Sequence, residues 1–285
     1  MELPWEQVDN LINLALVEDT GYGDPTSESL IPPGLGGRAA ILAKANGSLA
    51  GIDVVRRVFL QVDPLLVVEV HIHDGAKIKP GDIIATVRGS VASIFKAERV
   101  ALNFLQRLSG IATQAAQYVA RVQGLAVKIV DTRKTTPGMR LLEKYAVRMG
   151  GAQNHRFHLG DAVLIKDNHL AALRALGMSL PDIVAKAREN APRGLTVEVE
   201  VNTTEEALAV VEAGADIVML DNMDTDEMRR AVGLISGQAK IEASGGITLD
   251  NVKEVAMTGV DIISIGALTH SSKALDINLE FEPMP

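Results

Sequence analysis

The sequence predicts an α/β protein of two domains, an N-terminal α/β sandwich domain and a C-terminal reduced (incomplete) α/β barrel. Up to residues 110–125 the chain contains short strand-like runs punctuated by glycine and aspartate. Beyond this point apolar strands alternate with helices, which is typical of a parallel sheet. The six strands of this part span about 140 residues, whereas a complete eight-fold barrel needs about 250. An open doubly wound sheet is the alternative architecture.

The first domain is expected over residues 1–112. A helix-like segment covers 5–17, and a loop rich in glycine, proline and aspartate covers 18–34. Alternating apolar and polar residues predict strands over 37–46, 65–75 and 81–94. Within these, DGAKIKPGDIIATVRGS resembles the turn-rich ribbon of a lipoyl- or biotinyl-type sandwich in architecture only, because its lysines lack the carrier motif.

The barrel domain is expected over residues 113–270, after a long helix over 96–122 in which Gly110 is a candidate break. The predicted barrel strands cover 126–132, 162–166, 195–201, 216–222, 240–245 and 261–266. Thr136, Thr204 and Thr248 are expected to cap helices at their start, and Gly214 and Gly259 to end them.

Composition excludes several functional classes. The chain has 285 residues, a net charge of −8 and no cysteine. An acidic chain argues against a broad nucleic-acid-binding surface, and the absence of cysteine excludes thiolate metal sites and fits a reducing compartment. The N-terminus carries acids where a signal peptide carries bases, and no apolar run reaches about 18 residues. We therefore expect a cytoplasmic protein that does not enter the membrane.

Each predicted barrel strand ends on a chemically useful group. In barrels of this kind the active site lies at the carboxyl ends of the strands, so these residues are site candidates. In chain order they are Arg133 and Lys134, Lys166, Glu200, Asp221, Ser244 with Gly245 and Gly246, and Gly266. The glycine turns expose successive backbone N–H groups and are suited to a phosphate.

Alternation places further acids inside the barrel. Glu198 shares a face with Glu200, and Glu242 shares a face with Lys240. Buried charges are costly unless they are paired or bind a ligand. Glu198, Glu242 and Lys240 are therefore either an interior salt-bridge network or part of a ligand site. Glu200 and Asp221, nearest the mouth, favour a functional role.

Cations gather between residues 133 and 166. His155 and Arg156 lie in a loop that leads into a strand, and an arginine fork suits a carboxylate or a phosphate. Together with Arg133, Lys134 and Lys166 they indicate a ligand set with several negative charges, such as a diphosphate sugar and a small acid. The basic residues at four-residue spacing that follow Pro137 form either a solvated helix face or further ligand contacts; they are Arg140, Lys144 and Arg148.

The run DTRKTTPGMRLLEKYAVRMGGAQNHRFHLGDAVLIKDNH resembles the signature region of the quinolinate phosphoribosyltransferase family. Other family-like pieces follow in the same order over nearly the whole chain: EDTGYGDPTS, AERVALNFLQRLSGIAT, VEVEV, VMLDN, IEASGGI and ISIGALTHS. The resemblance implies a type II phosphoribosyltransferase fold in which residues 271–285 return to the first domain. It also implies a decarboxylating reaction in which quinolinate and phosphoribosyl pyrophosphate, with Mg²⁺ and no organic cofactor, give nicotinate mononucleotide, pyrophosphate and CO₂.

The resemblance also implies residue roles. Arg133, His155, Arg156 and Lys166 would hold the two quinolinate carboxylates, and Lys134 would lie near both substrates. The family forms homodimers or larger assemblies such as hexamers, and Arg99 would reach the site of the partner subunit. Glu200 and Asp221 would face the ribose hydroxyls, directly or through Mg²⁺, and act in catalysis with Lys134. The residues that would seat phosphate groups are Ser244, Gly245, Gly246, Gly266 and His270.

Two departures and three rival functions stand beside this interpretation. Phe157 and His158 replace the short apolar and small residues usual after the NHR motif, and Met149 replaces a smaller residue. The first rival is a related protein on the same scaffold, which transfers phosphoribose to another acid or acts near molybdenum transport. The second is a Schiff-base lyase that uses Lys134 or Lys166, and the third is a non-catalytic binding module. The strand-end acids argue against the last of these.

Overall fold

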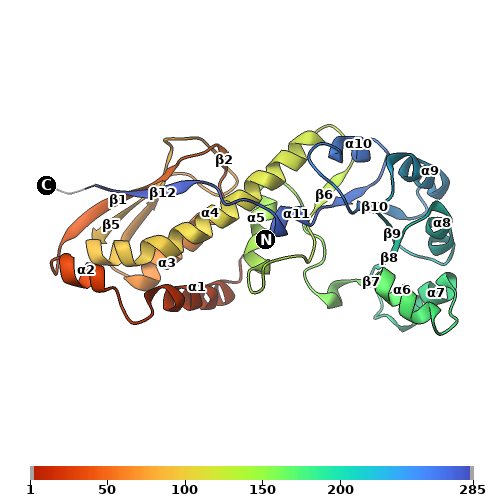
Figure 1. Ribbon diagram of the computed structural model, residues 1–285, viewed down its shortest axis with the longest axis horizontal. Coiled ribbons are helices and arrows are strands. Elements are labelled where there is room, and N and C mark those ends of the chain that lie inside the picture. Colours follow the sequence, from red (N-terminus) through yellow and green to blue (C-terminus); the bar gives the residue numbers. More distant parts are fainter. Residues whose placement is uncertain (1–2, 283–285) are drawn as a thin grey trace. The chain divides into compact units, whose positions relative to one another are not determined.

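The computed structural model describes residues 3–282 and consists of two compact units (Figure 1). Of the described residues, the first unit contains 3–116, 135–151 and 268–282, and the second contains 117–134 and 152–267. Segment 135–151, expected in the barrel domain, thus groups with the first unit. The predicted return of the C-terminal segment is seen for residues 271–282, and residues 283–285 lie outside the described part.

The first unit is built on a four-stranded antiparallel sheet. Its strand order is β12 (Ile277–Glu282), β1 (Gly36–Ala43), β5 (Ile83–Ser90) and β3 (Val67–Val70). Arg38 lies opposite both Glu282 and Arg88, so the C-terminal strand, blue in Figure 1, lies beside the first strand of the chain. Two short strands, β2 (Gly47–Ser48) and β4 (Lys77–Ile78), form a separate antiparallel pair.

The helices of the first unit include two that the sequence analysis did not predict. The predicted helix over 5–17 is present as α1 (Trp5–Thr20), but α2 (Pro25–Leu30) lies within the expected loop 18–34. Asp24 caps α2 by accepting a hydrogen bond from the Ser27 amide, and proline is favourable at the first helical position. The other, α3 (Ile52–Val62), buries Val54, Val58 and Phe59.

The long helix α4 (Val91–Arg121) runs without a break through Gly110. The expected break is therefore wrong, and the glycine has a different physical role. A β-carbon at this position would lie 1.9 Å from the carbonyl oxygen of Lys273. Gly110 is thus required for the close approach of the C-terminal segment to the helix.

The second unit is a six-stranded parallel sheet with the order expected of a reduced barrel. From the second strand on, each strand pairs with the next along the chain, and the last strand pairs with the first, whereas a doubly wound sheet reverses its order at a switch point. The strands are β6 (Lys128–Val130), β7 (Val163–Ile165), β8 (Val197–Val201), β9 (Ile217–Asp221), β10 (Lys240–Ser244) and β11 (Ile262–Ser264). The predicted fold class is confirmed, and the alternative is excluded.

Helices connect these strands, and some begin later than predicted. They are α5 (Arg140–Met149), the 3-10 turn η1 (Leu159–Asp161), α6 (Asp167–Arg174), α7 (Leu180–Asn190), α8 (Thr204–Glu212), α9 (Thr225–Ile235), α10 (Val252–Ala256) and α11 (Ala267–His270). The cap of α8 is Thr203 rather than Thr204. Thr136 and Thr248 cap no helix, because α5 follows Met139 and α10 follows Asn251. Gly214 and Gly259 lie just beyond helix ends with φ of 94° and 95°, as predicted.

Candidate active site

One cavity of about 280 Å³ in the second unit brings together six of the thirteen predicted site residues. Six of them line it: Arg133, Lys134, His155, Arg156, Lys166 and Ser244. Five lining residues were not singled out as substrate-binding: Thr132, Leu164, Met219, Glu242 and Ser264. Glu242 and Ser264 share a face with Ser244 by alternation along paired strands, and this signal could have found them.

The loop that carries His155 and Arg156 is held by buried acceptors. Asp131, which directly follows β6, has no exposed surface and accepts hydrogen bonds from the His155 amide at 2.9 Å and from Asn154 Nδ2 at 2.7 Å. Arg156 Nη1 donates to the carbonyl oxygen of Ala162 at 2.9 Å. Burial and the neighbouring Arg133 lower the pKa of Arg156. The two cations of this loop are therefore fixed at the wall of the cavity.

Lys166 and Glu200 form an ion pair at the carboxyl ends of neighbouring strands. Lys166 Nζ lies 3.0 Å from Glu200 Oε2, and Glu200 is 8% exposed. On the next strand, Asp221 accepts a hydrogen bond from Asn222 Nδ2 at 2.7 Å and lies level with Ser244. The two predicted acids thus lie on adjacent strands β8 and β9. A lysine paired in this way can bind an anion once the pair opens.

The glycine turn after β10 requires glycine for a steric reason. Gly245 has a φ of 83°, and a β-carbon there would lie 2.3 Å from Asn222 Oδ1. Gly246 has a φ of 63°, and its carbonyl oxygen accepts a hydrogen bond from Asn251 Nδ2 at 3.0 Å. The turn presents backbone beside Ser244. A phosphate site at this turn and at Gly266 stays a prediction.

His155 contacts two buried acids at the floor of the cavity. Its Nε2 atom lies 3.2 Å from Glu198 Oε2 and 3.4 Å from Glu242 Oε2. Its Nδ1 atom accepts a hydrogen bond from the Arg156 amide at 2.9 Å. Burial lowers the pKa of His155, but Glu198 and Glu242 outweigh this and raise it to about 10.

The raised pKa and the hydrogen bond at Nδ1 favour different states of the His155 ring. An imidazolium carries protons on both nitrogens, whereas an Nδ1 atom that accepts a hydrogen bond carries none. Both states have a proton on Nε2. Nε2 therefore donates towards the acids.

The predicted network of Glu198, Glu242 and Lys240 is wrong in one member. Lys240 begins β10 and is exposed, and it lines different cavities together with Arg188 and Asp216. The period of two along β10 puts Lys240 on the same face as Glu242, but two residues of strand, about 7 Å, separate the two positions. His155, from a loop distant in sequence, takes the place of the lysine.

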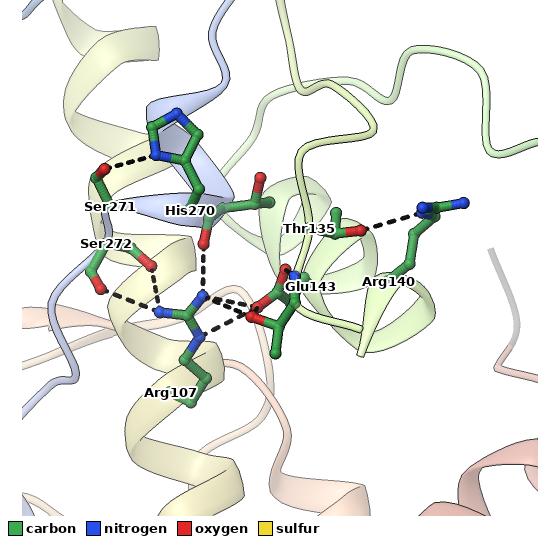
Figure 2. A network of polar contacts seen from close by, with 9 residues as sticks. Arg107, Thr135, Arg140, Glu143, His270, Ser271 and Ser272 are labelled. Atoms are coloured by element: carbon green, nitrogen blue, oxygen red, sulfur yellow. Dashed lines mark hydrogen bonds and ion pairs between the residues drawn. The ribbon is translucent and has the colours of Figure 1, made fainter. Parts of the chain in front are cut away.

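Two predicted site residues belong to the first unit. Arg99 is exposed on α4, and His270 ends α11 with its Nδ1 atom 2.6 Å from Ser271 Oγ. Figure 2 shows this region, in which Arg107 contacts Glu143 and Ser272. The Arg107 Nη2 atom lies 2.7 Å from Glu143 Oε1, a carboxylate without exposed surface. This network joins α4, α5 and the segment after α11.

The basic residues of α5 do not form one solvated face. Lys144 is fully buried, whereas Arg148 is exposed. Arg140 donates from Nε to Thr135 Oγ1 at 3.0 Å (Figure 2). These three residues belong to the first unit. The expectation of a solvated helix face is therefore wrong for Lys144.

Within residues 3–282, no helix is both long and apolar enough to cross a membrane.

Comparison with known proteins gives matches over nearly the whole chain. The N-terminal domain of quinolinate phosphoribosyl transferase matches residues 24–109, and its C-terminal domain matches residues 111–280. A probable nicotinate-nucleotide pyrophosphorylase (carboxylating) of Bacillus subtilis (strain 168) is 43% identical over 96% of this chain and 93% of its own. A mitochondrial quinolinate phosphoribosyltransferase (decarboxylating) of Nicotiana glauca is 41% identical over 98% of this chain and 83% of its own.

Solved structures agree with these matches. The structure of NadC from Streptococcus pyogenes is 40% identical, covers 100% of both chains and has a TM-score of 0.94. The nicotinate-nucleotide pyrophosphorylase from Francisella tularensis is 37% identical, covers 99% of this chain and 98% of its own, and has a TM-score of 0.91.

Proposed function

This chain belongs to the quinolinate phosphoribosyltransferase family, and on that premise we propose how its own side chains carry out the family's reaction. The enzyme transfers phosphoribose from phosphoribosyl pyrophosphate to quinolinate with decarboxylation, and gives nicotinate mononucleotide, pyrophosphate and CO₂. This is a step of de novo NAD biosynthesis.

One observation carries the assignment of the site. Four cationic side chains, Arg133, Lys134, Arg156 and Lys166, line a single cavity at the carboxyl ends of the barrel strands. A substrate pair with two carboxylates and a diphosphate supplies the negative charge that such a cavity binds. A neutral substrate would leave these cations uncompensated.

The roles that we propose are those implied by the family's motifs. Arg133, His155, Arg156 and Lys166 hold the quinolinate carboxylates, and Lys134, the exposed member of the pair after β6, also meets the phosphoribosyl side. Glu200 and Asp221 face the ribose, whose ring carbon becomes cationic as pyrophosphate leaves, and their carboxylates stabilise that charge. Ser244, Gly245, Gly246, Gly266 and His270 seat phosphate groups.

Decarboxylation needs positioning more than a basic group. Once the ring nitrogen is bonded to ribose it is cationic, so the adjacent carboxylate leaves as CO₂ and its electron pair stays on the ring carbon. That carbon then takes up a proton. The arginines keep the second carboxylate in place through this step.

Glu200 and Asp221 also fit a Mg²⁺ ion bound together with phosphoribosyl pyrophosphate. Mg²⁺ prefers oxygen ligands and commonly binds one or two carboxylates together with substrate phosphates. The two acids lie at the ends of neighbouring strands, as such binding requires. The ion would neutralise charge on the pyrophosphate.

We further propose a homodimer, or a larger assembly of dimers such as a hexamer, in which Arg99 reaches the partner's site. The exposure of Arg99 on α4 supports this. The cytoplasm is the proposed location, on the basis of the absence of cysteine. Phe157 and His158 are expected to alter the shape of the pyridine pocket, because they directly follow Arg156.

A direct assay tests the reaction. Purified protein is mixed with quinolinate, phosphoribosyl pyrophosphate and Mg²⁺, and nicotinate mononucleotide and CO₂ are measured. Equimolar release of both products is expected. Failure to form product from quinolinate, with nicotinate accepted instead, would contradict the assignment, and trapping of an imine by borohydride at Lys134 or Lys166 would favour a Schiff-base lyase.

A further inference from the structure

The floor of the substrate cavity contains an acidic pair that the proposed roles do not use. Glu242 lines the cavity, and Glu198 lies on the other side of His155 Nε2. The two residues are 0% and 1% exposed, respectively. They come from β10 and β8, with β9 between them, so the sheet itself fixes their separation.

These acids keep oxygens that receive no hydrogen bond. Neither oxygen of Glu242 has a hydrogen-bond partner, although Oε2 lies within ion-pair distance of His155, and Glu198 Oε1 also has none. A buried carboxylate oxygen without a hydrogen bond is costly, and the contact with His155 leaves three oxygens of this pair without one. The arrangement therefore indicates a role towards the ligand that enters the cavity.

That role is not to bind the substrate carboxylates, because like charges repel. The acids instead favour the gain of positive charge that the pyridine ring undergoes in the reaction. The ring is uncharged in quinolinate and becomes cationic when its nitrogen bonds to the ribose carbon. In a cavity lined by Arg133, Lys134, Arg156 and Lys166, a further cation would be disfavoured unless negative charge lay close to it.

We propose that Glu242, supported by Glu198, supplies a fixed negative charge beneath the pyridine pocket that stabilises the ring cation formed during phosphoribosyl transfer. In this step the nitrogen lone pair forms the bond to the ribose carbon, and the bond to pyrophosphate breaks with its electron pair leaving on oxygen. The ring gains one positive charge.

The inference rests on the proposed function and has a distinctive kinetic test. Glu242→Gln keeps the size of the side chain and removes its charge. We expect kcat to fall about tenfold or more, whereas the KM for quinolinate stays unchanged or decreases, because the variant loses repulsion as well as stabilisation. Glu198→Gln should give a smaller change in the same direction. Glu212→Gln, an exposed acid on α8, is the matched control and should behave as wild type.

Equilibrium binding provides a readout apart from turnover. Calorimetry with quinolinate and with nicotinate mononucleotide compares an uncharged ring with a cationic one. In Glu242→Gln the Kd of the mononucleotide should rise about tenfold while that of quinolinate does not rise.

The opposite pattern, a higher KM and Kd for quinolinate with kcat retained, would mean that the acids only position His155, and the proposal would be overturned. A circular dichroism spectrum like that of wild type shows that the variant is folded. If it is not, Glu198→Gln decides by the same two measurements. If wild type itself forms no nicotinate mononucleotide, the proposed function fails, whereas a normal wild type with an unaffected Glu242→Gln overturns this inference alone.

Discussion

His155 shows how much a single side chain depends on partners that lie far away in the sequence. Its motif, NHR, indicates a cation beside a carboxylate substrate, yet both of its ring nitrogens have contacts inside the protein. Nε2 donates towards Glu198 and Glu242, and Nδ1 accepts a hydrogen bond from the Arg156 amide. The side chain therefore links the floor of the cavity to the loop that carries Arg156.

This cluster makes stability depend on pH. The pKa of His155 is lowered by burial but raised more strongly by Glu198 and Glu242, to about 10, and burial also raises the pKa of Glu198. In the unfolded chain histidine titrates near about 6.5, so between these values the folded protein holds a proton that the unfolded chain has lost. The stabilisation is complete below about pH 6.5 and is lost as the pH rises towards about 10.

We therefore expect the free energy of unfolding to fall by on the order of a few kcal/mol across this range, and to fall less in His155→Gln. Urea unfolding of both proteins at several pH values measures it. Other groups titrate in the same range, so the difference between the two proteins is the relevant quantity. A difference that does not change with pH would contradict the expectation.

At the scale of elements, the sequence predicted the barrel strands well because each strand carries its own signal. Apolar runs ending in polar residues mark β6 to β11, and the shared geometry of parallel strands brings those endings to one cavity. The pairing of His155 with Glu198 and Glu242 had no such local signal, because it depends on how a loop folds onto two strands.

The two helices that the sequence analysis missed do carry a local signal in the sequence. Val54, Val55, Val58 and Phe59 recur at helical spacing and mark the buried face of α3. Asp24 before Pro25 is a typical helix start. The role of Gly110 has no local signal, because glycine is required there by the backbone of Lys273, which lies far along the chain.

Gly110 gives a test at this scale. Gly110→Ala places a β-carbon against the Lys273 carbonyl oxygen, so α4 and the C-terminal segment must separate. We expect a loss of about 1–3 kcal/mol or more in the free energy of unfolding. Gly233→Ala is the matched control, because Gly233 lies in α9 with nothing within 4 Å of a β-carbon. That change should stabilise by about 0.5–1 kcal/mol, as alanine does in a helix.

Thermal and denaturant unfolding of both variants measures this contrast. Equal effects at the two positions would mean that helix propensity alone matters and that the close approach at Gly110 carries no cost.

At the scale of the whole molecule, the proposed roles divide between the two units. Arg99 belongs to the unit built on the antiparallel sheet, and Glu200 belongs to the barrel. The sequence alone leaves Arg99 as a surface residue on a helix, and the substrate-binding role that we propose for it rests on family membership. A site shared between two subunits predicts a result in mixed dimers that a site within one subunit cannot give.

Arg99→Ala and Glu200→Ala should each abolish most activity, and mixing the two proteins should restore part of it. In a mixed dimer one site combines the intact Glu200 of one subunit with the intact Arg99 of its partner, while the other site carries both defects. Random exchange at equal amounts gives half mixed dimers with one working site each, so about a quarter of the wild-type activity should return.

The control mixture is Glu200→Ala with Asp221→Ala, two changes on the same barrel, where every mixed site keeps one defect and no activity should return. Differently tagged chains that co-purify demonstrate the exchange. If exchange is complete and the first mixture remains as inactive as the control, Arg99 acts within its own subunit or not at all, and the shared site is wrong.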